Sequence, residues 1–183
     1  MRRFLFFVAL ALFCAALSAA EEPRVIAEVK ALPKALSDDF QFRKTSTYFL
    51  TEHGKAVVDR RSSLSGKPTT AGPSSALNFE RQYHMHGAVT RLDQRHRTGH
   101  YFTFNWRARR AADLTVRLEY RQEKLRAFVQ AQEVSYHNAR GGMRSDFKVV
   151  GDDYFDDGRV ISWRCLLIEN GQIVAENRSY LWE

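Results

Sequence analysis

The chain has 183 residues, enough for one domain with a sizeable hydrophobic core. It carries 28 Lys and Arg against 21 Asp and Glu, a net charge of +7 that suits anionic partners. Its cysteines are Cys14 and Cys165, and Cys14 lies in an N-terminal segment that we expect to be removed. A framework of intramolecular disulfides is therefore excluded.

The N-terminus has the pattern of a secretory signal peptide. Arg2 and Arg3 precede an apolar run over 4–17, and the small residues of 18–20 follow it. We expect cleavage after residue 20, a net charge of +5 afterwards, and a secreted or periplasmic protein. The run is shorter than the roughly 20 residues of a membrane-spanning helix, so no span is expected after cleavage. Phe13 stands where lipidation of Cys14 needs a small residue.

Residues 21–61 form a weakly patterned leader. A short helix or a loose arm is expected within 24–43, where Pro33 interrupts an approximate helical spacing. A hairpin is expected from 45–51 and 56–58. Residues 62–76, rich in Gly, Pro, Ser and Thr, predict a linker or long surface loop before a domain over 77–183.

The body shows the two-residue alternation of half-buried strands. Strands are expected at 77–89, 102–106, 114–120, 147–150, 160–168 and 173–182. Residues 125–136 suit a strand or a helix, and 138–142 should end that element. A hairpin centred near 94–95 should join the first two strands, and a loop should join 102–106 to 114–120. Asn170-Gly171 predicts a type I′ turn, because both residues accept positive φ.

About seven short strands with regular turns predict an all-β fold. We expect an antiparallel two-sheet sandwich of the immunoglobulin or fibronectin type III kind, with a small β-barrel as the alternative. A simple turn at 170–171 would pair Trp163 with Arg178 and Cys165 with Glu176, mixing apolar and charged residues on one face. We therefore expect a bulge there. Cys165 lies in an apolar run and should be a buried, inert thiol.

Two clusters could hold a metal. His84 and His86 have the spacing of strand ligands for zinc or copper. The expected hairpin sets His84 opposite Asn105, however, so we favour solvent-facing histidines. The acidic run holds four aspartates that could gather calcium: Asp152, Asp153, Asp156 and Asp157. Their adjacency favours a solvated turn, so we expect no cofactor, with calcium as the alternative.

The basic charge is concentrated in the middle of the chain. Residues 81–144 hold 13 basic and five acidic side chains, while 145–183 are net acidic. Neutralisation across neighbouring strands, with Glu119 and Glu123 as partners, is one interpretation. The other is a ligand-binding face that combines charge with stacking, made by Tyr101, Arg107, Arg109, Arg110, Arg117 and Arg121.

The sequence contains no nucleophile elbow, zinc-protease motif, phosphate loop or dinucleotide fingerprint. We therefore expect a non-enzymatic exported protein whose arginine-rich face binds an anionic glycan or another envelope component. One alternative is an accessory envelope domain acting through protein–protein contacts at a sheet edge; another is a small metal-dependent enzyme. Nucleic acid is not an expected partner for an exported chain.

Overall fold

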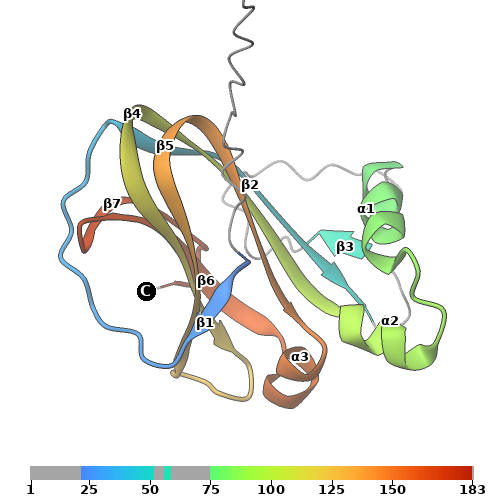
Figure 1. The fold of residues 1–183 in the computed structure, drawn as a ribbon. Helices are drawn as coiled ribbons and strands as arrows, with labels where there is room; N and C mark the ends of the chain where they lie inside the picture. Colours follow the sequence, from blue (N-terminus) through green and yellow to red (C-terminus); the bar gives the residue numbers. More distant parts are fainter. Residues whose placement is uncertain (1–21, 52–55, 59–74, 183) are drawn as a thin grey trace, which may run out of the picture.

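The computed structural model describes residues 22–51, 56–58 and 75–182 (Figure 1). Its strands are β1 (Arg24–Ile26), β2 (Phe40–Leu50), β3 (Ala56–Val58), β4 (Gly99–Gln122), β5 (Val129–Val150), β6 (Val160–Glu169) and β7 (Gln172–Arg178). The helices are α1 (Ser75–Met85), α2 (Arg91–Arg97) and α3 (Asp152–Asp157). No helix in these residues is both long and apolar enough to cross a membrane.

The strands form one antiparallel sheet in the order β1-β5-β4-β2-β3, with β6 pairing β4 and β7 pairing β6. The predominantly β, antiparallel fold expected from the sequence is confirmed. The sheet is continuous and is not closed. The two-sheet sandwich and the small barrel are therefore not confirmed.

Strand β4 covers both segments that were predicted to be separate strands joined by a loop. That prediction was wrong, because residues 107–113 contain no Gly, Pro or Asn to reverse the chain. Register shifts between Ala108 and Leu114 bend the strand instead. The first half of β4 pairs with β2 and the second half with β6, so the two halves do not pair with each other.

Strand β5 follows the same bend. Residues 138–142 were expected to end it, but β5 runs through them to Val150. Asn138 (φ 50°) and Gly141 (φ 85°) take left-handed conformations beside the register shifts of β4. The two long strands can therefore curve together while they stay hydrogen-bonded.

The bend encloses the core. Alternate residues of β4 are buried on one face: Phe102, Phe104, Trp106, Leu114, Val116, Leu118 and Tyr120. Phe104, in the first half of β4, packs edge-on against Trp163 of β6, with ring centroids 5.3 Å apart. Cys165 is fully buried, which confirms the expected burial, and that burial raises the pKa of its thiol.

The β6–β7 hairpin has the predicted turn and the predicted irregularity. Asn170 (φ 51°) and Gly171 (φ 76°) both take positive φ, as a type I′ turn requires. The register shifts between Leu167 and Ile168. As a result Leu166, and not Cys165, stands opposite Glu176, which confirms the expected bulge.

The strand predicted over 77–89 and the hairpin centred near 94–95 are wrong, because these residues form α1 and α2. Phe79 and Tyr83 fit a period of two, but their four-residue spacing suits a helix equally well. Thr90 and Asp93 form a capping box that starts α2, with Thr90 Oγ1 accepting from the Asp93 N–H at 3.1 Å and Asp93 Oδ2 accepting from the Thr90 N–H at 2.9 Å.

The leader contributes to the same sheet. Arg24–Ile26 is a strand paired with β5, and not part of a helix. Strand β2 pairs with β3 over 48–50, as the expected hairpin requires. On its other edge β2 pairs with β4. The hairpin's turn and nearly all of the expected linker, 62–74, lie outside the described residues.

Replacing Gly99 by alanine should destabilise the fold strongly. Gly99 has φ +140°, and an added Cβ would lie 2.3 Å from the backbone oxygen of Val149. Backbone strain and overpacking together should lower the free energy of unfolding by on the order of 3 kcal/mol. Chemical denaturation measures this, with Gly142→Ala as the control because its Cβ meets nothing within 4 Å. Equal stability of the two variants would contradict the close approach of β4 and β5.

Candidate functional site

A groove of about 630 Å³ opens between β2 and β7. Its floor is apolar, with Phe40, Trp163 and Ala175 all buried. Its rim carries the exposed cations Arg43, Lys44 and Arg178, of which the first two come from β2 and the third from the end of β7. An apolar floor with a few polar groups at its border is the usual composition of a binding site.

The groove exists because the sheet is open at this point. Strand β3 pairs with β2 only over 48–50, so no described strand lies beside the outer edge of 41–46. On β7, a segment around Lys34 occupies only the start of the outer edge, where the Ala35 N–H donates to the Ile173 oxygen at 2.9 Å and the Ser37 N–H to the Val174 oxygen at 3.0 Å. No described strand continues along 175–178.

A side-chain hydrogen bond joins the two strands across the groove: Asn177 Nδ2 donates to Thr45 Oγ1 at 2.6 Å. Glu176 is already bound by Lys34, with Nζ 2.6 Å from Oε2, and lies 3.9 Å from Arg164. Arg43, Lys44 and Arg178 have no ion pair among the described residues. The remaining carboxylate of the lining is Asp38, so the potential at the rim is positive.

The floor also holds an unsatisfied donor. The Nε1–H of Trp163 is buried and has no acceptor among the described residues, whereas the Nε1–H of Trp106 donates to Ser145 Oγ at 2.9 Å. A buried unpaired donor costs about 1–3 kcal/mol. A ligand carbonyl reaching the indole would remove that cost.

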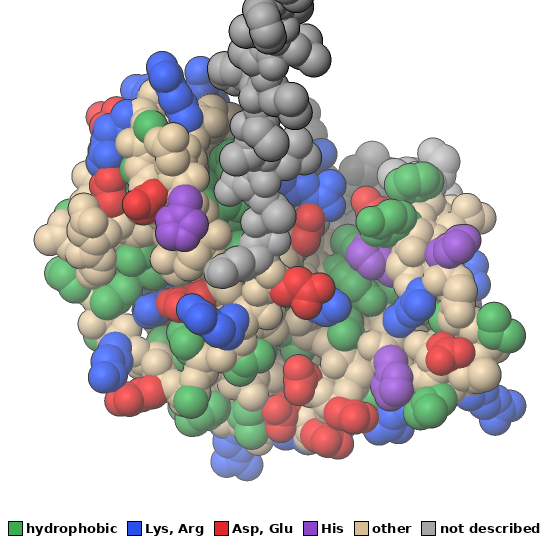
Figure 2. Space-filling model, viewed as in Figure 1, with side chains coloured by type: hydrophobic (Ala, Val, Ile, Leu, Met, Phe, Trp, Pro, Cys, Tyr) green, Lys and Arg blue, Asp and Glu red, His purple; other side chains and the backbone are tan. Residues whose placement is uncertain are grey.

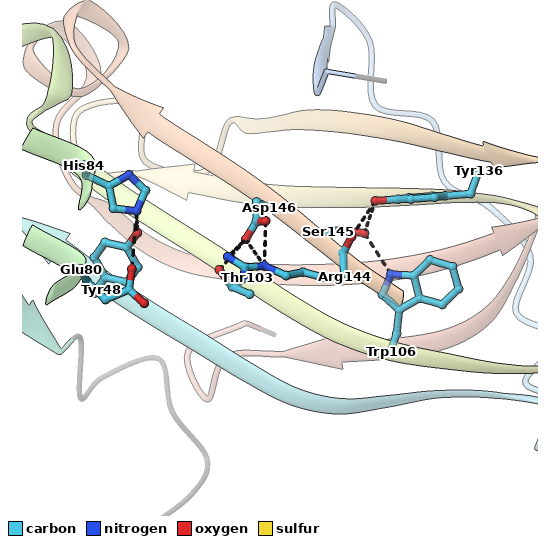
Figure 3. Close-up of polar contacts among 9 residues, drawn as sticks. All are labelled: Tyr48, Glu80, His84, Thr103, Trp106, Tyr136, Arg144, Ser145 and Asp146. Atoms are coloured by element: carbon cyan, nitrogen blue, oxygen red, sulfur yellow. Dashed lines mark hydrogen bonds and ion pairs between the residues drawn. The ribbon is translucent and has the colours of Figure 1, made fainter. Parts of the chain in front are cut away.

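A second polar cluster fastens α1 to the sheet (Figure 3). His84 Nε2 hydrogen-bonds the Tyr48 hydroxyl and lies 3.6 Å from Glu80 Oε2. The His84 ring is also 4.1 Å from the ring of Tyr101, whose hydroxyl donates to the Arg97 carbonyl at 2.7 Å. Burial lowers the pKa of His84, raises that of Tyr48, and raises that of Tyr101 to about 12. The contacts of the His84 ring with these two tyrosine rings hold the helix in place.

Further along β4 and β5, polar groups are paired with one another (Figure 3). Asp146 accepts from Thr103 Oγ1 at 2.6 Å and from Arg144 Nε at 2.8 Å. Ser145 accepts from Trp106 and is hydrogen-bonded to the Tyr136 hydroxyl at 2.8 Å. Burial is the main reason that the pKa of Tyr136 is raised. These contacts fix the positions of neighbouring strands.

The predicted ligand-binding residues lie in several environments. Tyr101 is buried beneath α1, while Arg107 and Arg109 are exposed. Arg110 binds Glu169 through two bonds of 2.5 and 2.6 Å and also Asp39 at 3.2 Å. Arg117 binds Glu133 at 2.5 Å, and the Arg121 guanidinium lies 4.5 Å from the Trp182 ring centroid. The strand pairing that would set Arg117 and Arg121 beside Arg107 is not formed.

The metal candidates are also separated. His84 faces Tyr48, and the expected pairing with Asn105 is wrong because Asn105 stands opposite Lys44 and Arg144. His86 is exposed after α1. The four aspartates of 152–157 belong to helix α3, and not to a turn. Among the described residues no group of three or more His, Cys, Asp or Glu side chains is placed to hold a metal ion.

Sequence reasoning missed the groove because its two sides are more than 120 residues apart in the chain. The only sequence feature close to the groove was the mixing of apolar and charged residues that a simple turn at 170–171 would have produced, which predicted the bulge between β6 and β7. The comparisons add no relative: no protein-family model, curated protein or solved structure matches the chain. The function must therefore be argued from the geometry.

Stability should depend on pH through His100, a buried histidine of the core. Burial, together with the positive charge of Arg159, lowers its pKa to about 3. In the unfolded chain the imidazole has a pKa near 6.5, so the unfolded state binds the extra proton between these values, and stability falls as the pH drops from about 6.5 toward 3.

Replacing His100 by phenylalanine should remove the group that binds this proton in the unfolded chain. The slope of unfolding free energy against pH, measured by urea denaturation near pH 5, should fall by about 1.4 kcal/mol per pH unit. The control is His137→Phe, which changes an imidazole that is 85% exposed. A slope in His100→Phe equal to that of the wild type would refute a buried neutral imidazole.

Proposed function

We propose that the protein is an exported, non-enzymatic binding domain that holds an extended segment of a partner protein in the groove between β2 and β7. The observation that carries this proposal is the presence of two strand edges at one groove, neither fully paired by a described strand. Unpaired edges are templates for another strand. Export rests on the predicted signal segment.

The chain itself illustrates how such a segment would bind. Backbone groups of 33–37 already donate to and accept from β7, in a parallel arrangement. A partner segment would continue this pairing beyond Val174 or pair with the outer edge of β2. Successive side chains of an extended segment point to opposite sides, so apolar ones would meet Phe40 and Ala175 while the others meet the rim.

The rim favours an acidic segment. Arg43, Lys44 and Arg178 would attract carboxylates, and such charge complementarity raises association rates and selects partners. The buried Nε1–H of Trp163 would donate to a carbonyl oxygen of the segment. An anionic glycan on the arginine-rich face is the second candidate, but carboxylates of the same domain already bind Arg110 and Arg117, so we favour the peptide.

Selection of random 12-residue peptides on phage against the immobilised protein tests the proposal. We expect enrichment of peptides in which acidic residues alternate with apolar ones. The triple variant Arg43→Glu, Lys44→Glu, Arg178→Glu should bind these peptides about tenfold or more weakly, because three rim contacts of up to about 1 kcal/mol each are lost and become repulsive.

The matched control reverses three other exposed arginines that have no ion pair among the described residues: Arg107, Arg109 and Arg140. This control should bind the peptides as the wild type does. Heparin, a polyanionic glycan, separates the two candidates. Loss of heparin binding in the control variant, without any peptide enrichment on the wild type, would favour the glycan and reject the groove.

A further inference from the structure

Helices α1 and α2 and the turn between them expose an unusual amount of apolar surface. Four large hydrophobic side chains within 14 residues are more than 60% exposed: Phe79, Tyr83, Val89 and Leu92. Figure 2 shows hydrophobic side chains over these helices together with basic ones. We name this surface the helical patch. Clustered exposed apolar groups mark interaction sites more often than isolated ones do.

The helical patch is held outward by contacts on the other side of α1. Met85 packs against the Tyr48, Leu50 and Tyr101 cluster, and His84 bonds to Tyr48. Phe79 and Tyr83, one turn apart, are stacked on each other with ring centroids 6.4 Å apart. Their exposure therefore follows from how α1 is fastened to the sheet.

The solvent-exposed charge on α1, α2 and the turn between them is positive. Arg81 and Arg91 are exposed and have no ion pair among the described residues. The two carboxylates of the segment are used locally, because Glu80 lies beside His84 and Asp93 caps α2. Aromatic and aliphatic side chains next to unpaired arginines are the composition of helices that lie in a membrane interface.

We propose that the helical patch docks the protein on an anionic phospholipid bilayer. Phe79, Tyr83 and Leu92 enter the boundary between headgroups and acyl chains, and Arg91, beside Leu92 at the start of α2, binds a lipid phosphate. The β2–β7 groove and the cavity beside residues 27–31 lie elsewhere. The patch is a convex surface on short helices, which suits a fluid bilayer, and the proposal stands independently of the groove.

Flotation with vesicles tests the docking. The protein recovered after export is mixed at low salt with vesicles of phosphatidylcholine alone or of equal parts phosphatidylcholine and phosphatidylglycerol. The wild type should float with the anionic vesicles and remain in solution with the neutral ones. Phe79→Gln with Tyr83→Gln should lower the partition coefficient about tenfold or more, and separately Arg91→Gln should lower it about fivefold.

The control is Phe128→Gln with Tyr180→Gln, which removes two aromatic side chains of similar exposure, 59% and 79%, outside the patch. This control should float as the wild type does, and unchanged melting temperatures establish that every variant is folded. Absence of flotation by the wild type would overturn the proposal. So would undiminished flotation of the Phe79→Gln, Tyr83→Gln variant, or an equal loss in the control.

Discussion

The bend in the paired strands β4 and β5 is the constraint on which the rest of the structure depends. Alternate residues must keep facing the core on both sides of the bend, and the register shifts between Ala108 and Leu114 allow this. Because of the bend, Phe104 from one half of β4 meets Trp163, whose strand pairs with the other half. Bulges inserted at other positions would turn apolar side chains of one half toward solvent.

The same bend accounts for the groove. It brings β2 and β7, on opposite halves of β4, within reach of the Thr45–Asn177 hydrogen bond without bringing them into a ladder. No described strand pairs with β2 along 41–46 or with β7 along 175–178, so both edges remain open at the groove. The floor is rigid because Trp163 packs on Phe102 and Phe104, so little side-chain freedom would be lost when a segment binds.

The sequence predicted those parts that depend on local pattern. Alternation placed the strands around Phe104 and Leu118, a continuous apolar run placed the strand around Cys165, and Asn170-Gly171 specified its turn. The sequence pattern could not show that β4 and β5 are continuous strands. The bulge between Ala108 and Leu114 lies in a segment rich in Arg and Ala, where no alternation of apolar residues is visible. The alternation also led to the wrong assignment of α1, since the spacing of Phe79 and Tyr83 fits both periods. The capping signal of Thr90 and Asp93 could have indicated α2.

The basic and acidic parts of the chain explain where charge remains for binding. Carboxylates neutralise the arginines that face strand partners. Glu119, for example, is buried, and its Oε2 lies 2.7 Å from Arg164 Nε. Without an arginine partner this buried carboxylate would destabilise the fold. Cations that have no ion pair among the described residues remain at the groove rim and on the helical patch, as well as at Arg107, Arg109 and Arg140. Strand β2 connects the rim and the patch, because Tyr48 at one end fastens α1 while Arg43 and Lys44 border the groove. Strand β2 pairs with β4 on both sides of a bulge between Phe42 and Lys44. One strand therefore connects the two surfaces, and a domain docked through the patch would restrict the orientation of its groove to the bilayer.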